Sequence, residues 1–169
     1  EIEQFGANNL VEVLERVPGV YMVGSYLNPQ SVVSIRGDLS VHYNVHTLFL
    51  INGRPTRETI FGGLDSSLLL AFPLDTIDKI EVIRGPGSVL YGSNAYSGVV
   101  NIITKKPEKI DIKVTAGYGS FNTNKATGTV AYGNEDFNFI AGGKFLRNLG
   151  WDFKAKDEQN KDINKKYSQ

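Results

Sequence analysis

Residues 80–104 read IEVIRGPGSVLYGSNAYSGVVNIIT, and this stretch decides the fold. Alternating apolar residues predict a strand over 77–83, entered through a turn or a short helix, and the glycines and proline at 85–87 end it. A short helix is expected over 88–91 and a second strand over 99–104. Strands and helices that follow one another so closely predict a mixed domain of the α+β class.

The sequence before this stretch combines one helix with short strands. Apolar residues at positions 10, 13, 14 and 17 lie on one helical face, and Pro18-Gly19 ends the predicted helix. Short apolar runs predict strands over 20–23, 32–35 and 48–51. The last run is apolar on both faces, as in a buried central strand, and it stops at the Asn52-Gly53 turn. Residues 54–67 are expected to form a long loop, followed by a helical turn or two.

The character of the sequence changes near residues 105–108, which read KKPE. Three alternating runs follow, at 112–118, 126–132 and 137–145, each with an apolar face of small and aromatic residues. Strands of about 10 residues with such a face are the weak signature of a membrane β-barrel, although these runs taken alone favour a soluble antiparallel sheet. Residues 154–169 are polar and charged and are expected to form a loop or to be disordered. The candidates for an aromatic girdle at a membrane interface are Tyr118, Tyr132, Phe145 and Trp151.

Composition excludes several classes of protein. The 169 residues carry 18 Lys and Arg against 18 Asp and Glu, a balance that argues against a nucleic-acid binder. The absence of cysteine excludes disulfides and thiolate metal sites. The longest apolar run, at 68–72, is far shorter than the roughly 20 residues of a membrane helix. The N-terminus has no basic region before an apolar core, so we expect no signal peptide in this chain.

Five segments, in this order and spacing, resemble the plug domain of TonB-dependent outer-membrane receptors. Each motif is loose by itself, but five in register are specific, and together they cover about residues 5–107. The alternating strands that follow stand where this family places the start of its barrel. The segments are LVEVL at 10–14 running into VPGV at 17–20, SIRG at 34–37, FLINGRP at 49–55, IEVIRGPGSVLYG at 80–92 and GVVNIITKK at 98–106.

This resemblance implies a plug over residues 1–107 and the first strands of an incomplete barrel over 108–169. The plug is expected to be a mixed four-stranded sheet with two or three short helices, held inside a barrel of about 22 strands in the outer membrane of a Gram-negative bacterium. Receptors of this family bind and import a scarce ligand such as an iron-siderophore, haem or cobalamin, without catalysis and without a cofactor. TonB supplies the energy through an N-terminal TonB box, which is expected to be missing from this sequence because it begins inside the first helical region.

Two arginines are candidates for contacts between plug and barrel. Arg36 and Arg84 each end a predicted strand beside a glycine. In the family, arginines at these positions pair with glutamates of the barrel. The alternative is an ordinary surface ion pair, which contributes less than about 1 kcal/mol.

Two loops are candidates for ligand contact. If 20–23 runs outward, 32–35 returns and 48–51 runs outward again, so the loops that follow 23 and 53 share one end of the sheet. Aromatic and amide groups suit an organic metal chelate, and an arginine suits an anionic one. The alternative is a solvated loop. The candidate residues are Tyr26, Asn28, Gln30, Arg57, Glu58 and Phe61.

Other chemistry is less well supported by the sequence. His42 and His46 have the spacing of a helical metal site, but the alternation around them is not helical, and the same strand argument places them away from the ligand. The loop at 84–88 lacks the Gly-Lys-Ser/Thr ending of a phosphate loop. A soluble interaction domain that binds a protein by pairing of strand edges is the alternative function. Unpaired strands in such a chain also predict self-association.

Overall fold

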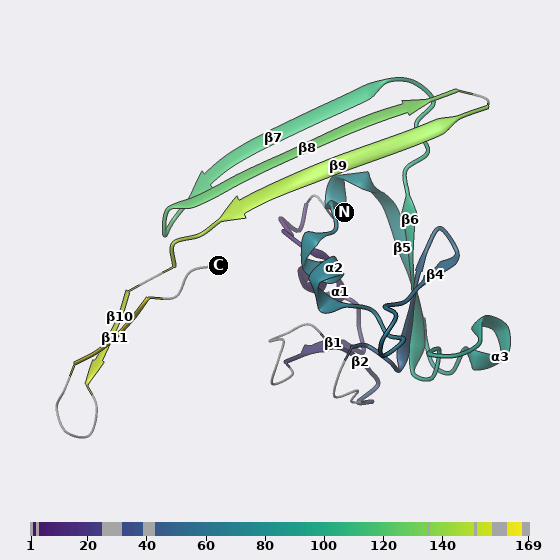
Figure 1. Ribbon diagram of the computed structural model, residues 1–169, viewed down its shortest axis with the longest axis horizontal. Coiled ribbons are helices and arrows are strands. Elements are labelled where there is room, and N and C mark those ends of the chain that lie inside the picture. The colour runs from purple at the N-terminus through teal and green to yellow at the C-terminus, as the bar shows by residue number, and fades with distance from the viewer. Residues whose placement is uncertain are drawn as a thin grey trace. The chain divides into compact units, whose positions relative to one another are not determined.

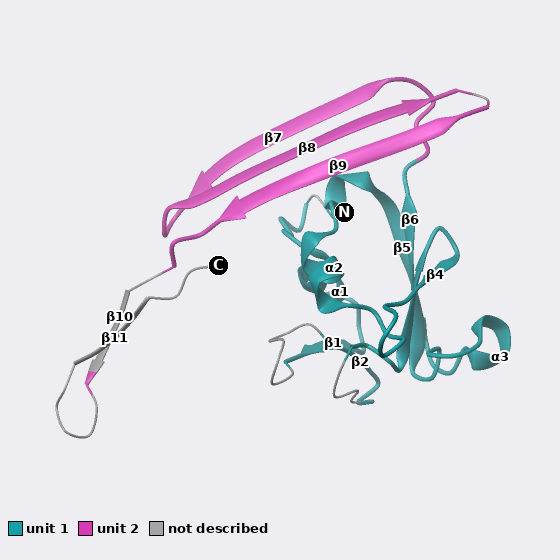
Figure 2. Cartoon of the chain, in the orientation of Figure 1, with its two compact units in different colours: residues 1–105 teal, residues 106–169 magenta. Residues whose placement is uncertain are grey.

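The computed structural model describes residues 2, 4–24, 32–38, 43–134, 136–150, 152–156 and 162–166 of the chain (Figure 1). These residues fall into two compact units, Glu1–Lys105 and Lys106–Gln169 (Figure 2). All the helices in the described ranges belong to the first unit, and the second unit is built from strands. The α+β architecture predicted from the sequence is confirmed.

The first unit opens with a short helix and a hairpin. Helix α1 (Leu10–Leu14) is capped by Asn9, whose side chain accepts a hydrogen bond of 3.0 Å from the Glu12 amide. The helix ends earlier than its apolar period predicts, because the chain turns toward Pro18 directly after it. Strands β1 (Val20–Val23) and β2 (Val32–Ile35) then pair antiparallel in a two-stranded sheet of their own.

A mixed four-stranded sheet forms the centre of this unit, in the order β4-β3-β6-β5. Its strands are β3 (Thr47–Ile51), β4 (Arg54–Thr56), β5 (Ile77–Arg84) and β6 (Gly98–Thr104). Strand β3 pairs parallel with β6, and the other two pairings are antiparallel. The sequence predicted β3, β5 and β6. Strand β4 was expected as loop, because three residues around a proline carry no alternating pattern.

Short helices connect these strands. Helix α2 (Ser66–Ala71) and the 3-10 helix η1 (Leu74–Thr76) lead from β4 into β5, and α3 (Ser88–Tyr91) leads from β5 toward β6. Asp65 caps α2 by accepting a hydrogen bond of 2.7 Å from the Ser67 amide. Gly98 begins β6 because a side chain at this position would collide with Ile35 and with the Ile83 carbonyl, so only glycine lets β2 pack there.

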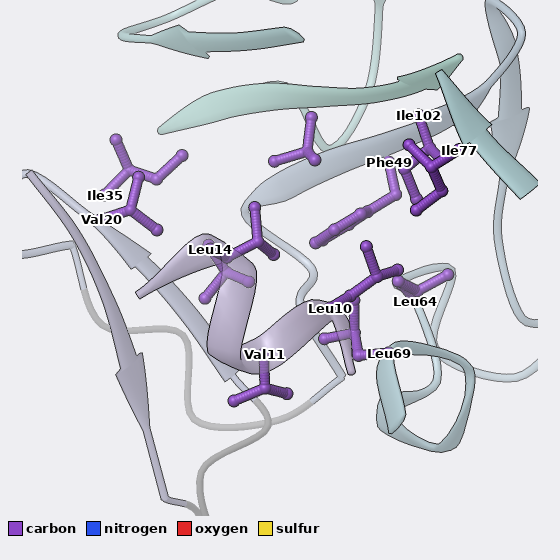
Figure 3. Close-up of a cluster of buried hydrophobic side chains, with 12 residues drawn as sticks. Leu10, Val11, Leu14, Val20, Ile35, Phe49, Leu64, Leu69, Ile77 and Ile102 are labelled. Carbon is purple, nitrogen blue, oxygen red and sulfur yellow. The ribbon is translucent and has the colours of Figure 1, made fainter. Parts of the chain in front are cut away.

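Apolar side chains from α1, the hairpin, the sheet and α2 meet in one cluster (Figure 3). A smaller cluster on the other face of the sheet comprises Leu48, Leu50, Ala95 and Val99. Because β3 contributes to both clusters, it is buried on both faces, as its unbroken apolar run predicted. The main cluster consists of Leu10, Val11, Leu14, Val20, Val33, Ile35, Phe49, Leu64, Leu69, Ile77, Val100 and Ile102.

One buried amide joins three separate segments of this unit. Asn44 is fully buried and has a positive φ of 50°. Its Oδ1 accepts a hydrogen bond of 2.7 Å from the Val33 amide, and its Nδ2 donates one of 3.3 Å to the Leu64 carbonyl. The side chain thus links β2, the turn before β3 and the segment before α2.

The second unit contains a three-stranded antiparallel sheet of β7 (Asp111–Gly119), β8 (Thr123–Gly133) and β9 (Asn138–Arg147). The register places apolar residues of all three strands on one face, in rows such as Ile112–Val130–Ala141. Polar rows such as Thr115–Thr127–Lys144 lie on the other face. The large apolar side chains of the first face are exposed. This sheet is therefore amphipathic, with its apolar face uncovered within the unit.

Beyond β9, strands β10 (Asp152–Lys156) and β11 (Asp162–Lys166) form an antiparallel hairpin, so the prediction of a loop or a disordered segment over 154–169 is wrong for these strands. The alternation in DFKAK at 152–156 is short and DINKK at 162–166 has a single apolar residue, so the sequence signal for this hairpin is weak. Within the described ranges, no helix is long and apolar enough to cross a membrane.

Replacing Asn44 with alanine is expected to lower the free energy of unfolding by about 3 kcal/mol, because the Val33 amide and the Leu64 carbonyl both lose a buried partner. Asn94→Ala is the matched control. Asn94 also has a positive φ, of 71°, but it is only partly buried, and its Nδ2 donates a hydrogen bond to the Val45 carbonyl. Urea unfolding of both variants measures the difference. Equal decreases in the free energy of unfolding of the two variants would contradict the linking role of Asn44.

Replacing Asp65 with alanine is expected to cost about 1 kcal/mol at pH 7, the usual contribution of a helix N-cap. Hydrogen bonds from the Ser67 side chain and amide lower the pKa of Asp65, so its ionised form stabilises the folded state. This stabilisation is present above the ordinary pKa and is lost as the pH falls through the lowered one. Urea unfolding at pH 7 and pH 3 measures the free energy of unfolding of wild type and D65A. The difference between the two proteins should be smaller at pH 3 than at pH 7. Asp65→Asn, which still caps, should remove that pH dependence.

Candidate functional site

The two arginines predicted to contact a barrel lie together in the structure. Arg36 follows β2 with a positive φ of 54°, and its amide donates to the Gly19 carbonyl at 3.1 Å. Arg84 ends β5, and its Nη1 donates a hydrogen bond of 2.6 Å to the Pro18 carbonyl. A Cβ at Gly85 would lie 3.6 Å from Nη1 of Arg36. Both side chains are exposed beside the turn that joins α1 to β1.

The register of the central sheet explains this meeting. Arg84 pairs with Gly98, and Gly98 pairs with Thr47, so the end of β5 and the starts of β6 and β3 lie at one end of the sheet. Neither guanidinium forms an ion pair with a carboxylate of the described residues. The two arginines therefore present two positive charges at one end of the sheet.

The second candidate loop, which contains Arg57, Glu58 and Phe61, also lies at the start of β3. The sequence did not predict this position. From the strand directions, this loop was expected at the outward end of β3. Instead, β3 and β4 form a hairpin, so the chain has already returned to the start of β3 when it reaches Arg57. The turn before β3 was expected to lie away from this loop, and that expectation is wrong, because the rings of Tyr43 and Phe61 stack at 4.5 Å with an angle of 12°.

Within this loop, each predicted ligand residue has a different environment. Arg57 is exposed, and its Nη2 donates a hydrogen bond of 2.9 Å to the Ser93 carbonyl. Phe61 is exposed on one side and stacked on Tyr43 on the other. Glu58 is partly buried, and its carboxylate accepts hydrogen bonds from three backbone amides of the loop.

The remaining candidates of the first loop, Tyr26, Asn28 and Gln30, lie outside the described residues. His42 is outside them as well. His46 is described, and its Nδ1 lies 3.0 Å from Asp38 Oδ2 while its ring contacts that of Tyr96. Its carbonyl accepts hydrogen bonds from the amides of Tyr96 and Ser97. His46 thus joins the segment after β2 to the segment before β6.

Across the described part of the chain, no group of three or more His, Cys, Asp or Glu side chains is placed to hold a metal ion. The loop at 85–88 also has little capacity for phosphate. The amides of Gly85 and Gly87 donate to the carbonyls of Ser97 and Ala95, and the Ser88 hydroxyl donates to Ala95 as well. These groups serve the connection between β5 and β6.

Sequence reasoning missed Tyr43 and Asn44, which hold the Phe61 loop in place. The only local signal is the residue type of Asn44, because asparagine adopts positive φ more readily than most other residues apart from glycine. Their partners, Phe61 and Leu64, lie about 20 residues along the chain. The second unit adds a hollow of about 700 Å³ at the β7–β8 turn, where Tyr118 and Phe121 are two of its lining residues.

Comparison with known proteins gives consistent results. Residues 1–99 match the model of the TonB-dependent Receptor Plug Domain family. The vitamin B12 transporter BtuB of Photobacterium profundum is 40% identical over 134 residues, 79% of this chain and 21% of the relative. The vitamin B12 transporter BtuB of Vibrio vulnificus is 37% identical over 158 residues, 91% of this chain and 25% of the relative.

Among solved structures, the siderophore receptor PirA from Pseudomonas aeruginosa superposes with a TM-score of 0.57 at 26% identity. The alignment covers 87% of this chain and 26% of PirA. The chain therefore spans about a quarter or less of the length of the proteins that it matches. These relatives are transporters and receptors, not enzymes.

The match to the family model covers more than half of the chain and includes the first four motifs and the first two residues of the fifth. The resemblance found in the sequence is confirmed, as is the predicted architecture of a plug followed by antiparallel strands. This chain belongs to the family of TonB-dependent receptor plug domains.

Proposed function

We propose that this chain forms the plug and the first barrel strands of an outer-membrane receptor that binds and imports cobalamin. The observation that supports this most is the likeness to two relatives named vitamin B12 transporter, at 40% and 37% identity. One alignment spans 158 residues, which is longer than the first unit, Glu1–Lys105, so the likeness continues into the second. An iron-siderophore or haem is the competing ligand.

The second unit supports the barrel assignment. Small residues such as Gly128 and Gly143 occupy the middle of its apolar face, with Tyr118 toward one end and the Tyr132–Phe139 pair toward the other. Asn124, which pairs with Tyr118, and Tyr132 are about 26 Å apart along β8 at about 3.3 Å per residue. With the strand tilt of about 35–45° found in outer-membrane barrels, this separation projects to about 20 Å along the membrane normal, somewhat less than the apolar band of about 25 Å between their two aromatic girdles. We assign residues 1–107 to the plug and 108–169 to the barrel of a Gram-negative outer membrane.

The arginine pair supports a plug–barrel contact. Arg36 and Arg84 bring two guanidinium groups to one exposed place, and each guanidinium has five N–H donors, more than its contacts within the plug occupy. Carboxylates on the inner wall of a barrel are suitable partners for such a pair. We propose that these two arginines hold the plug in the barrel.

The exposed side chains of Arg57 and Phe61 support a role of the plug in binding. We propose that two loops of the plug contribute to ligand binding. Their residues are Arg57, Glu58 and Phe61 on one loop and Tyr26, Asn28 and Gln30 on the other. TonB is the proposed energy-supplying partner, as the family name implies. A soluble interaction domain is the weaker alternative, because the relatives that this chain matches are transporters and receptors.

The ligand assignment is tested in a Gram-negative host that requires external cobalamin and lacks its own transporter. The full-length receptor that contains this chain is expected to restore growth on cyanocobalamin and to bind the radiolabelled compound saturably. In a host without TonB, binding should remain while uptake is lost. Saturable binding of a ferric siderophore in place of cyanocobalamin would contradict the assignment.

Replacing both Arg36 and Arg84 with alanine in the full-length receptor is expected to increase sensitivity to a large antibiotic such as vancomycin, because a loosened plug leaves the barrel open. In the isolated chain the same change should lower the free energy of unfolding by about 1 kcal/mol or less, since the hydrogen bond of Arg84 is exposed. Arg54→Ala, which removes an exposed arginine from β4, is the control. Vancomycin sensitivity equal to that of the control would exclude the plug–barrel role.

A further inference from the structure

The carboxylate of Glu58 closes a turn of its own loop. Its Oε2 accepts a hydrogen bond of 2.9 Å from the Ile60 amide, and its Oε1 accepts one from the Phe61 amide. The same Oε1 accepts a third, of 2.9 Å, from the Gly62 amide. Three consecutive amides that converge in this way form an anion-binding concavity, and here the chain's own carboxylate fills it.

Backbone contacts hold the same turn at its base. The Glu58 amide donates to the Gly63 carbonyl at 2.7 Å, and the Gly62 amide donates to the Glu58 carbonyl at 3.2 Å. Gly63 packs against the backbone of Tyr43 so closely that a Cβ at this position would collide with the Tyr43 carbonyl. The turn therefore sits on the segment that Asn44 fixes to β2.

The closed turn presents apolar groups to solvent. Ile60 is 79% exposed and Phe61 is 56% exposed, and the other side of the Phe61 ring is stacked on Tyr43. Three amide dipoles point at the charge of Glu58, and both of its oxygens already accept hydrogen bonds. The turn at 60–62 therefore presents an apolar surface on a preorganised backbone. Such a surface binds a ligand with less loss of conformational entropy than a flexible loop does.

We infer that Glu58 is a positioning residue, which holds the turn at 60–62 closed so that Ile60 and Phe61 contact an uncharged, apolar part of the ligand. This inference rests on the proposed cobalamin function, because it concerns the same loop. An anionic group of a ligand finds no free donor among these three amides, since Glu58 occupies them. The loop thus favours a ligand with a neutral face over a polyanionic chelate at this contact.

The ionisation of Glu58 agrees with this role. Desolvation acts to raise its pKa, but the amides of Ile60, Phe61 and Gly62 outweigh it and the pKa is lowered. Asp65, on the segment before α2, acts to raise it, and Arg57 is the adjacent cation. The closed turn is thus stabilised above the ordinary carboxyl pKa, and that stabilisation is lost as the pH falls through the lowered value.

The closing of the turn by Glu58 is tested first in the chain without any ligand. Glu58→Gln retains one oxygen in place of two and removes the charge, so exchange of the Ile60, Phe61 and Gly62 amides with solvent deuterium should accelerate about tenfold. Glu108→Gln, at an exposed carboxylate, is the control and should leave these amides unchanged. Wild-type exchange should accelerate in the same way when the pH falls through the lowered pKa, after correction for intrinsic rates. Unchanged exchange in E58Q would overturn the inference.

The positioning role is tested by a double-mutant cycle in the full-length receptor, with cyanocobalamin as the probe. Glu58→Ala and the double change Ile60→Ala/Phe61→Ala should each weaken binding about tenfold, with little change in melting temperature. If Glu58 acts through the turn, E58A should cost nothing further once the two apolar side chains are removed. Additive losses would show a direct contact of Glu58 and overturn the inference.

The two proposals fail in different ways. If the wild-type receptor binds no cyanocobalamin, the proposed function fails and the ligand contact inferred for Ile60 and Phe61 fails with it. The exchange experiment still decides whether Glu58 closes the turn, because it needs no ligand. If the receptor binds cyanocobalamin but E58A binds as well as wild type, only the positioning role is overturned.

Discussion

The parallel pairing of β3 with β6 is the constraint on which the rest of the first unit depends. It aligns Thr47 with Gly98 and thereby brings the starts of two strands and the end of β5 to one end of the sheet. Arg84, His46 and the segment before Gly98 are neighbours for this reason, although about 50 residues separate β3 from β6. The antiparallel return through β4 then adds the loop at Arg57 to the same end.

Polar groups of three residues help to hold this end together. Asn44 joins β2 to the segment before α2, His46 joins the strand ends through its carbonyl, and Glu58 closes the loop between them. Each accepts hydrogen bonds from backbone amides, so each satisfies groups that the irregular connections leave without a ladder partner. The apolar cluster of α1 and the sheet provides the stability, while these residues specify the loop geometry.

Much of the fold could be predicted from the sequence, because periodicity is a local signal. The apolar runs of β2, β3 and β6 and the alternation of β7 to β9 identified those strands, and five motifs in register identified the family. Strand β4 could not be predicted, since three residues around Pro55 carry no pattern. The stacking of Tyr43 on Phe61 and the meeting of Arg36 with Arg84 depend on pairing between distant strands. The proposed site residues were therefore recognisable by chemistry and by family motif, but their neighbours were not.

The connection lengths in the two units have a consequence for the order of folding. Strands β7, β8 and β9 are joined by turns of a few residues, so their hairpins close within microseconds of being released from the ribosome or a chaperone. The pairing of β3 with β6 has to close a loop of about 50 residues and therefore loses more entropy before any native contact forms. The hairpins of the second unit therefore close faster than the pairing of β3 with β6. Their apolar face is consequently exposed to water early, when strands without a covering partner are prone to associate.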